Sequence, residues 1–513
     1  MGWAVSGGAA ATSDGACSRA DFASRSLAAT VSAVRTTGYA APGDGGAALY
    51  KRVGSQPAHA GKFQSTDGSW WELAESAPCW RMFGAKGDDS ADDTPAIRGA
   101  IAFANLKGLT LAPTPGVYRY RATSAQAITC PIRGAGKNET IVKVNASGFT
   151  GAAFHTTDLK EVGGFSLRET SGSLSGTGIY VAAADPANFQ GGGALNDVHV
   201  LGFDKNVAFS NVYRCSLINC LIEYGNEGLY ISPVRDPAKN GGDNGYYTNI
   251  LIRDSIIQYN ARNVYANSTG VGRQLTFWDT IIQDPTGSEQ SQFYKNADVK
   301  FYTAYFEGGA SVPAITIDNS TIQIDHGYMN ATGGIDLGSR AGRLMLNNIA
   351  TTSQTDTVVA TGTAGQSVII ENADLPALNV TSDFQLYRNS TIGGVYHGWE
   401  VLAQAAGLAV RRTNADDHSN PLINLDSYVV TAPGQTVPAH GAVVVRNDYR
   451  VNALREGEAT ATPLKSQAGL IFTASPDPAG NPEFVRMVVH NVTASPITMP
   501  DTEVRVSIRR FAS

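Results

Sequence analysis

The chain has 513 residues, of which 42% are hydrophobic and only 16% are charged, and its formal net charge is -6. This charge leaves no excess of basic residues for a phosphate backbone, so nucleic acid is not an expected partner. No apolar run reaches the roughly 18 residues that indicate a spanning helix, so no membrane insertion is expected. The first 21 residues lack the basic and apolar regions of a standard export signal.

The composition favours a β-rich chain. There are 55 glycines, and Thr, Ser, Asn, Val and Ile recur throughout, as expected where many short strands are joined by tight turns. The five cysteines show neither a CxxC motif nor the spacing of metal ligands, and we expect them to be reduced and mostly buried. No metal and no cofactor is expected.

Residues 1–80 are predicted to form a separate N-terminal module that serves as a head or attachment domain. The pair Asp67-Gly68 is a hairpin-type turn between alternating apolar positions. Trp70 and Trp71, which follow this turn, can anchor a small core.

A short amphipathic helix is predicted next, over residues 95–104. Thr94 is a candidate N-cap, and Pro95 stands at the first helical position, where its missing N–H costs nothing. Asp92 and Asp93 lie at the positive end of the helix dipole. We expect this helix to close the open end of an apolar body.

The residues around this helix resemble the opening motif of the pectate-lyase-like β-helix superfamily. The resemblance is carried by FGAKGD at 83–88, DDT at 92–94 and IRGAI at 97–101. It implies an all-β chain built on a single-stranded right-handed parallel β-helix. Asp89 stands where the superfamily usually has glycine. The acids of the motif cap a helix, so the motif indicates a fold and not a reaction.

An internal repeat points to the same fold. Seven six-residue segments align, with successive offsets of 35, 25, 23, 23, 22 and 24 residues. They begin at Asn219, Asp254, Asp279, Tyr302, Asp325, Asn347 and Glu371. Such periods are typical of stacked units, each too small to bury its apolar face alone. We therefore expect a β-helix over residues 81–394.

Two features of the repeat bear on its surface. Asn219, Asp254 and Asp279 recur just before the strand and are expected to form a ladder of turns that bond their own backbone. The offset of 35 reflects an insertion at 233–247, and we expect this loop to border a ligand groove.

The period is lost from about residue 395, and the strands become longer and alternate. Residues 395–513 are therefore predicted to form a small antiparallel β-sandwich, for trimerisation or carbohydrate binding. The phrase VRMVVHNVTASPITMP at 485–500 resembles the C-terminal domains of phage tail proteins.

Together the two resemblances imply a phage tailspike or polysaccharide depolymerase. Such a protein binds a bacterial surface polysaccharide, which is a capsule, an exopolysaccharide or an O-antigen. It is a homotrimer on the virion that joins a phage tail or baseplate protein through its N-terminal module. A secreted extracellular enzyme is the alternative location.

Aromatic residues mark the candidate sugar site, because a pyranose has an apolar face that stacks on aromatic rings. The window 246–306 holds twelve aromatics in 61 residues, about twice the 9% of the whole chain. The residues expected to bind substrate are Trp278, Tyr246, Tyr247, Arg235 and Arg253.

The candidate catalytic residues are carboxylates in this window. In the repeat alignment Asp284 and Glu307 share one column on adjacent turns, and stacked strands lie about 4.8 Å apart. That spacing is close to the roughly 5–5.5 Å of a retaining glycosidase. Glu223 is the reserve acid at an inverting-type distance. An endo-acting glycoside hydrolase is therefore the favoured activity.

Two other functions stay open. A non-catalytic adhesin needs aromatics and amides but no pair of acids, and a polysaccharide lyase needs basic residues beside a uronate. Of the motifs of the polygalacturonase-like branch only Asp325-His326-Gly327 is present, so its mechanism is not transferred.

Overall fold

The computed structural model describes most of residues 17–510. The gaps lie at 158–159, 184–189, 233–246, 288–290, 308–314, 331–333, 338–341, 352–356, 361–366, 376, 381–383, 393–394, 404–424, 433–434, 438, 440–441, 451–456, 464–469, 477–483, 492 and 500–501. The chain divides into two compact units, formed by residues 1–336 with 349–356 and by residues 337–348 with 357–513. No helix in the described part is long and apolar enough to span a membrane.

The first unit begins with a four-stranded antiparallel sheet whose strand order is β1-β2-β4-β3. Its elements are α1 (Arg19–Ala23), β1 (Ala33–Arg35), β2 (Leu49–Val53), β3 (Lys62–Gln64) and β4 (Trp70–Leu73), followed by the 3-10 helix η1 (Trp80–Phe83). Trp71 is fully buried and stacks on Phe63 at 5.9 Å. The structure thus confirms that Trp71 anchors a small core.

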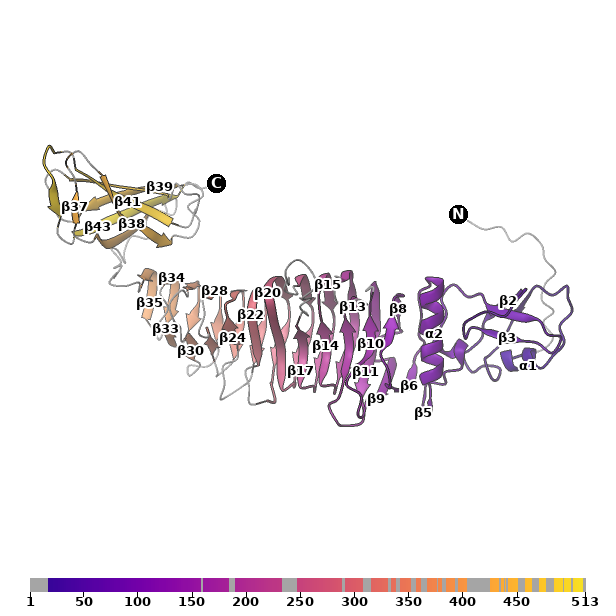
Figure 1. Ribbon diagram of the computed structural model, residues 1–513. Helices are drawn as coiled ribbons and strands as arrows, with labels where there is room; N and C mark the ends of the chain where they lie inside the picture. Colours follow the sequence, from indigo (N-terminus) through magenta and orange to yellow (C-terminus); the bar gives the residue numbers. More distant parts are fainter. Residues whose placement is uncertain are drawn as a thin grey trace. The chain divides into compact units, whose positions relative to one another are not determined.

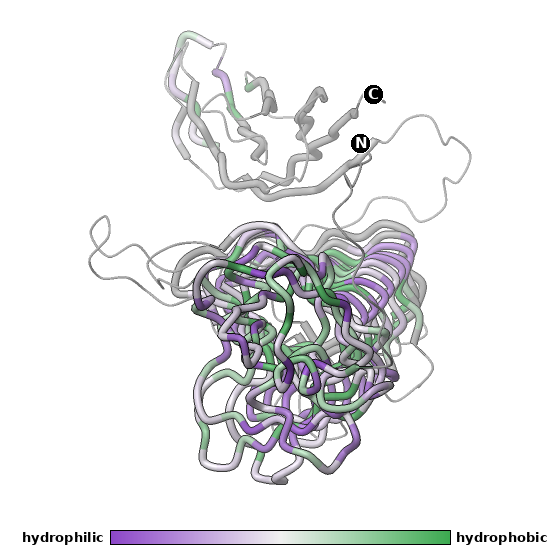
Figure 2. The backbone as a smooth tube through the Cα atoms, turned by 90° about the vertical axis from the view of Figure 1, so that its right-hand side faces the viewer, coloured by the Kyte–Doolittle hydropathy of each residue, from purple (hydrophilic) through white to green (hydrophobic). Residues whose placement is uncertain are grey.

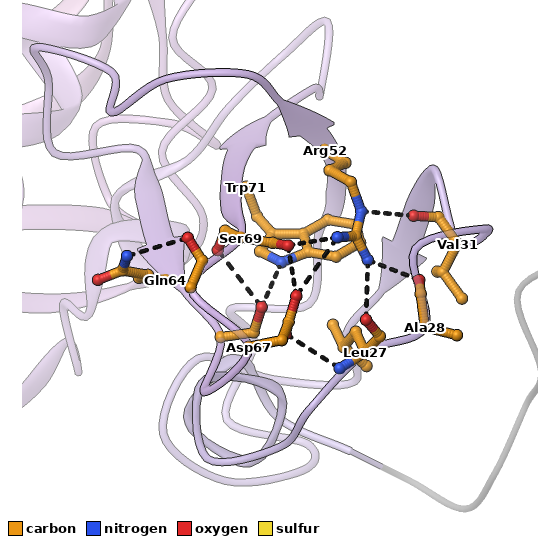
Figure 3. A network of polar contacts seen from close by, with 10 residues as sticks. Leu27, Ala28, Val31, Arg52, Gln64, Asp67, Ser69 and Trp71 are labelled. Atoms are coloured by element: carbon orange, nitrogen blue, oxygen red, sulfur yellow. Dashed lines mark hydrogen bonds and ion pairs between the residues drawn. The ribbon is translucent and has the colours of Figure 1, made fainter.

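Arg52 ties this sheet to the segment that precedes it. Its guanidinium lies 4.6 Å from the centre of the Trp71 ring, and its Nε donates to the Val31 carbonyl at 2.8 Å (Figure 3). Its Nη2 donates to the carbonyls of Leu27 and Ala28 at 3.2 and 2.7 Å. One charged group therefore satisfies three carbonyls of an irregular segment.

The expected helix is present as α2 (Thr94–Lys107) and lies across the end of the coil (Figure 1). The apolar face of α2 is buried and contacts β6 (Gly116–Arg121) and β7 (Gln126–Ile128). The N-cap is Asp93 and not Thr94, which corrects the prediction. The Thr94 hydroxyl instead accepts a 2.7 Å hydrogen bond from the backbone N–H of Arg121.

The departure from the superfamily motif at Asp89 has a structural explanation. Asp89 has φ of 58°, in the left-handed region that favours glycine. Its carboxylate pairs with Lys143 at 2.6 Å and with Arg119 at 3.4 Å. Aspartate tolerates this backbone conformation better than most residues, and the ion pairs hold it there.

The body of the first unit is a right-handed parallel β-helix, as expected, and the whole chain holds about nine turns of parallel coil. Each turn contributes a strand to three parallel sheets, here named A, B and C, and the turns overlie one another along the coil axis (Figure 2). Because parallel pairing satisfies the backbone between turns, the apolar side chains can fill the interior.

Sheet A faces the candidate site and contains the shortest strands. It is formed by β5 (Asp88–Asp92), β6, β9 (Thr140–Asn145), the ends of β11 (Glu161–Glu169) and β13 (Gln190–Leu201), then β16 (Leu221–Glu223), β19 (Ile256–Gln258), β21 (Ile281–Gln283), β23 (Tyr305–Glu307), β26 (Tyr328–Asn330) and β29 (Ala350–Thr351).

Sheets B and C complete each turn. Sheet B contains β8 (Ile132–Arg133), the starts of β11 and β13, β15 (Val212–Ile218), β18 (Thr248–Arg253), the ends of β20 (Arg262–Trp278) and β22 (Gln292–Tyr302), and β25 (Thr321–Asp325). Sheet C contains β7, β10 (Ala152–Thr156), β12 (Thr177–Val181), β14 (Lys205–Phe209), β17 (Glu227–Ile231), the starts of β20 and β22, β24 (Ile315–Asp318) and β27 (Ile335–Asp336).

A left-handed residue marks the corner between sheets B and A on each of these turns. The corner residues of the first unit, all with φ between 46° and 57°, are Asp197, Asn219, Asp254, Asp279, Thr303 and His326. The predicted recurrence of Asn219, Asp254 and Asp279 at one corner is confirmed. The predicted bonding is corrected, because the N–H of Asp254 donates to the Trp278 carbonyl of the next turn at 3.1 Å. The corners are thus bonded between turns.

The register corrects the sequence alignment. Thr303 and His326 occupy the corner that was assigned to Tyr302 and Asp325, so the alignment is shifted by one residue after Asp279. Gln283 pairs with Glu307, which places Asp284 one position beyond this pair.

A buried asparagine network fixes the far end of the sheet A strands. Asn206 Nδ2 donates to Asn260 Oδ1 at 2.9 Å, and Asn260 Nδ2 donates to Asn263 Oδ1 at 3.0 Å. The same network donates to the carbonyls of Glu223 and Gln283, each at 2.9 Å. Since buried polar groups need partners, these bonds hold the ends of β16 and β21 in place.

The second unit holds parallel strands followed by antiparallel ones. Its strands are β28 (Arg343–Asn347), β30 (Thr357–Ala360), β31 (Ser367–Glu371), β32 (Asp374–Leu375), β33 (Ala377–Val380), β34 (Phe384–Ile392), β35 (Val395–Ala403), β36 (Leu425–Ala432), β37 (Gln435–Val437), β38 (Ala442–Arg450), β39 (Gly457–Pro463), β40 (Leu470–Pro476), β41 (Phe484–Asn491), β42 (Ile497–Met499) and β43 (Thr502–Arg510). From β36 onward every pairing is antiparallel, in the orders β36-β43-β39, β38-β41-β40 and β37-β42. The sandwich and the three domain boundaries stay predictions.

All five cysteines are buried, as expected, and Cys79, Cys130, Cys215 and Cys220 are free thiols. Burial raises the pKa of the Cys130 and Cys220 thiols to about 11. These thiols therefore stay protonated and unreactive near neutral pH.

Replacing Arg52 by methionine is expected to destabilise the N-terminal sheet by about 2 kcal/mol, because several carbonyls lose a charged donor. Hydrogen exchange of the peptides that contain β2 and β4, measured in the full chain, checks this value. Arg35→Met is the matched control, because Arg35 is exposed and makes only a 3.5 Å ion pair with Glu75. Equal effects of the two changes would contradict the role of Arg52.

Candidate functional site

The outward side chains of β16, β19, β21 and β23 in sheet A form a surface that we name the ladder face. In the buried column of these strands stand Ile222, Ile257, Ile282 and Phe306. The neighbouring outward column is polar and consists of Glu223, Gln258, Gln283 and Glu307, on four successive turns. Successive side chains of a strand point to opposite faces, so even these three-residue strands place one side chain in the core and its neighbour on the surface.

Hydrogen bonds link three members of this polar column. Gln283 Nε2 donates to Gln258 Oε1 at 2.8 Å, and Gln258 Nε2 donates to Glu223 Oε2 at 2.8 Å. Glu307 accepts a 2.8 Å hydrogen bond from the Tyr305 hydroxyl. The ladder thus presents an ordered row of amides with a carboxylate at each end.

His199 borders the ladder at Glu223. Its Nε2 lies 2.9 Å from Glu223 Oε1, and both side chains are 11% exposed. Burial lowers the pKa of His199, although the Glu223 carboxylate acts in the opposite direction. Glu223 is therefore held by His199 on one side and by Gln258 on the other.

Aromatic residues line both edges of the ladder face. Tyr224 and Tyr259 follow the polar column in the chain, and their rings stack at 5.1 Å. Trp278 and Tyr302 precede the corner, and their rings lie 5.1 Å apart. Trp278 is 47% exposed and Tyr224 is 51% exposed, so rings at both edges are accessible to a sugar.

Asp284 lies beside Tyr259 at the end of β21. The negative charge of its carboxylate is the largest of the effects that raise the pKa of the Tyr259 hydroxyl. Its backbone N–H donates to the Glu307 carbonyl at 3.0 Å. Asp284 and Glu307 are therefore on adjacent turns, as predicted, but not in one column.

The structure separates the five predicted substrate-binding residues. Tyr246 and Arg235, with most of the inserted loop, lie outside the described residues. Tyr247 is fully buried, which corrects its assignment, because a ring inside the coil has no surface for a ligand. Arg253 is exposed and pairs with Asp254 at 3.0 Å. Arg253 and Trp278 are paired across β18 and β20.

Sequence reasoning missed His199, Gln258 and Gln283. The glutamines stood in the alignment next to the chosen column, where a one-residue shift hid the pairing of Gln283 with Glu307. His199 lies on the turn before the aligned repeats. The recurring IIQ of β19 and β21 was the available signal.

A further acid, Glu227, lies on sheet C. Burial raises the pKa of Glu227 to about 7, because the effect of burial is larger than the opposite effect of the Arg262 and Lys205 charges. Its carboxylate lies 3.3 Å from Arg262, and the rings of Tyr230 and Tyr265 stack 5.2 Å apart on the same strands. A carboxyl group that is half neutral near pH 7 is able to donate a proton.

No cluster of three or more His, Cys, Asp and Glu side chains with the arrangement of metal ligands is found in the described part of the chain. The chemistry of the ladder face is that of carboxylates, amides and aromatic rings.

The buried His199 predicts a pH effect on stability. Because its folded pKa lies below the unfolded value of about 6.5, the unfolded state binds more protons as the pH falls through 6.5, and stability decreases. We expect the wild type to lose more stability than His199→Gln between pH 7.5 and 5.5. Parallel thermal unfolding curves of both proteins over this window would contradict the prediction.

Comparisons with known proteins agree with the fold. No family model and no curated protein matches the chain. Among solved structures, the gp42 tailspike of Acinetobacter phage vb_AbaP_AS12 is 12% identical with a TM-score of 0.52, and the match covers 94% of this chain and 93% of that one.

Two further structures have lower TM-scores. The gp49 tailspike of Acinetobacter baumannii bacteriophage Fri1, a capsular polysaccharide depolymerase, is 14% identical over 93% of this chain and 95% of that one, with a TM-score of 0.39. A GH87 alpha-1,3-glucanase of Streptomyces thermodiastaticus is 14% identical over 65% and 69%, with a TM-score of 0.45. The likeness to the gp42 tailspike, the one of the three with a TM-score above 0.5, supports the parallel β-helix fold.

Proposed function

We propose that this chain is a tailspike-type protein that binds a bacterial surface polysaccharide and cleaves it as an endo-acting glycoside hydrolase. The observation that carries the proposal is the ladder face. Its acid and amide column on sheet A lies between the rings of Tyr224 and Tyr259 and the rings of Trp278 and Tyr302, which stand before the corner at the end of sheet B. Polysaccharide recognition needs stacking platforms and hydrogen-bonding amides, and glycosidic cleavage needs two carboxylates. All three are present on adjacent turns.

The proposed catalytic pair is Asp284 and Glu307. Asp284 lies one position beyond Gln283, which pairs with Glu307 on a strand about 4.8 Å away. The proposal requires that their carboxylates approach the roughly 5–5.5 Å separation of a retaining enzyme. The hydrogen bond from the Tyr305 hydroxyl orients the carboxylate of Glu307, which suits a nucleophile. Asp284 then serves as the general acid, at the edge of the ladder face beside Tyr259.

Glu223 is the reserve acid. It lies three turns from Glu307, or about 14 Å, which exceeds the roughly 9.5 Å limit of an inverting pair. It lies two turns from Gln283, and thus about 10 Å from Asp284. Asp284 is therefore the acid whose distance from Glu223 is close to the upper limit of an inverting pair, and neither acid lies at a retaining distance from Glu223.

A non-catalytic adhesin is the second candidate function. The bonds that engage Glu223 with His199 and Gln258, and Glu307 with Tyr305, favour it, because engaged carboxylates and amides are suited to binding. A lyase is a further alternative, in which Arg253 supplies the basic group. Attachment to a phage tail through the N-terminal module, a homotrimer and a virion location complete the proposal.

Changing Asp284 to Asn or Glu307 to Gln is expected to lower turnover about a hundredfold or more, because general acid–base groups contribute at least that much. Purified bacterial capsular polysaccharides are incubated with each variant, and the products are separated by size. Asp279→Asn is the control, because Asp279 is a corner residue two positions before β21 begins.

The same assay separates the alternatives. Normal cutting by both amide variants would refute the proposed pair. The acid on sheet C would then be tested with Glu227→Gln. Products with the ultraviolet absorption of an unsaturated uronate would indicate a lyase. Binding without any shortening of the polymer would indicate an adhesin.

Trp278→Ala is expected to weaken polysaccharide binding about tenfold, which corresponds to the loss of one stacking platform worth about 1.4 kcal/mol. Tyr213→Ala is the matched control, since Tyr213 is 41% exposed on sheet B but lies far from the corner along β15. Affinity is measured by surface plasmon resonance on immobilised polysaccharide. An equal loss in both variants would exclude a specific role for Trp278.

A further inference from the structure

The polar column of the ladder face continues toward the N-terminal end of the coil, where its charge changes sign. Arg119 pairs with Lys143, and Lys143 pairs with Arg168, on three successive turns of sheet A. Leu201 follows and pairs with Glu223, where the ladder begins. The outward column is therefore cationic over three turns before it becomes acidic and amide-rich.

The carboxylates of the chain do not balance this cationic stretch. Asp89 alone pairs with both Lys143, at 2.6 Å, and Arg119, at 3.4 Å. Within the described residues, no carboxylate lies within ion-pair distance of Arg168. Three stacked cations thus share one anion, and Arg168 is the cation nearest to the ladder.

The guanidinium of Arg168 is also short of hydrogen-bond partners. Its Nη2 donates to the Ser166 hydroxyl at 3.5 Å, and its buried Nε has no partner among the described residues. A buried donor without a partner destabilises the folded state, and a charged donor does so more strongly. A bound anion would remove this cost.

The charged groups near Arg168 either have partners already or are themselves cationic. Lys137 Nζ donates to the carbonyl and the side-chain oxygen of Asn219 at 2.7 and 2.9 Å, so it is fully engaged. Arg168 and Lys137 both lower the pKa of His199. The Glu223 carboxylate is held by His199 and Gln258, and it is two turns away from Arg168.

We propose that Arg168, with Lys143 beside it, binds a carboxylate of the polysaccharide, so that the substrate is an acidic polymer that contains uronate. This inference rests on the proposed function and deepens it. A guanidinium binds a carboxylate with two parallel hydrogen bonds. The polymer then runs along the coil axis, from the cationic turns to Asp284, which lies four turns or about 19 Å from Arg168.

The structural alternative is that Arg168 packs its aliphatic stem on the sheet and binds nothing. Its backbone pairing with Lys143 and Leu201 does not require a charge at this position. The two readings differ in their response to a carboxylate ligand, which is the basis of the test.

The first arm of the experiment does not depend on the identity of the polysaccharide. Thermal unfolding of the full chain is measured with glucuronate, and with methyl glucoside and sulfate as controls, for the wild type, Arg168→Met, Arg168→Lys and Arg133→Met. Arg133 is an exposed arginine already paired with Glu161 at 2.7 Å. We expect glucuronate to stabilise the wild type and Arg133→Met, to act weakly on Arg168→Lys, and to have no effect on Arg168→Met.

The same stabilisation of Arg168→Met by glucuronate would overturn the inference, as would an equal response of the wild type to sulfate. Absence of any glucuronate effect on the wild type would also overturn it. None of these results bears on whether the protein cleaves a polysaccharide.

The second arm uses a panel of neutral and uronate-containing bacterial capsular polysaccharides. We expect the bound members to contain uronate, and we expect reduction of their carboxyl groups to weaken wild-type binding about tenfold while leaving Arg168→Met unchanged. Binding of a neutral member would refute the acidic substrate but leave the proposed function intact. Binding of no member would refute the proposed function, and the glucuronate arm would still decide the role of Arg168.

Discussion

The stacking of parallel strands at about 4.8 Å is the constraint on which the rest of the structure depends. Every turn has to return its backbone to the register of the turn before, and a left-handed residue at each corner makes this possible. Once the register is fixed, each outward side chain lies over its counterpart. A residue type that recurs in the sequence therefore becomes a column on the surface, as Glu223, Gln258 and Gln283 show.

The fold was largely predictable because its two determinants are local. The opening motif and the closing helix are short segments, and the coil repeats its pattern. What the sequence concealed was the register after Asp279. Asn and Asp are typical of a left-handed corner, whereas Thr303 adopts the same φ although a β-branched residue is disfavoured there. His326 stands at the next corner, one position after Asp325. The N-cap is Asp93 and not the predicted Thr94, because the Thr94 hydroxyl accepts a hydrogen bond from the backbone N–H of Arg121, a tertiary contact that the sequence does not reveal.

The candidate site was only partly predictable. Composition located the aromatic window, and Trp278 is exposed there, but composition does not tell which side of a strand a ring occupies, and Tyr247 lies inside the coil. The one-residue shift hid the amide ladder that separates Glu223 from Glu307. His199 and Arg168 lie on earlier turns, where no repeat was aligned, and only the register reveals that they border the same column.

The central claim is that the ladder face of sheet A is the surface on which the polysaccharide is bound and cut. A crystal structure of the Glu307→Gln variant with an oligosaccharide of the cleaved polymer tests it most directly. The account predicts sugar rings along β16, β19, β21 and β23, with a glycosidic oxygen within hydrogen-bond distance of Asp284 and a ring against Trp278 or Tyr224. An oligosaccharide bound on sheet C beside Glu227, with the ladder face empty, would contradict it.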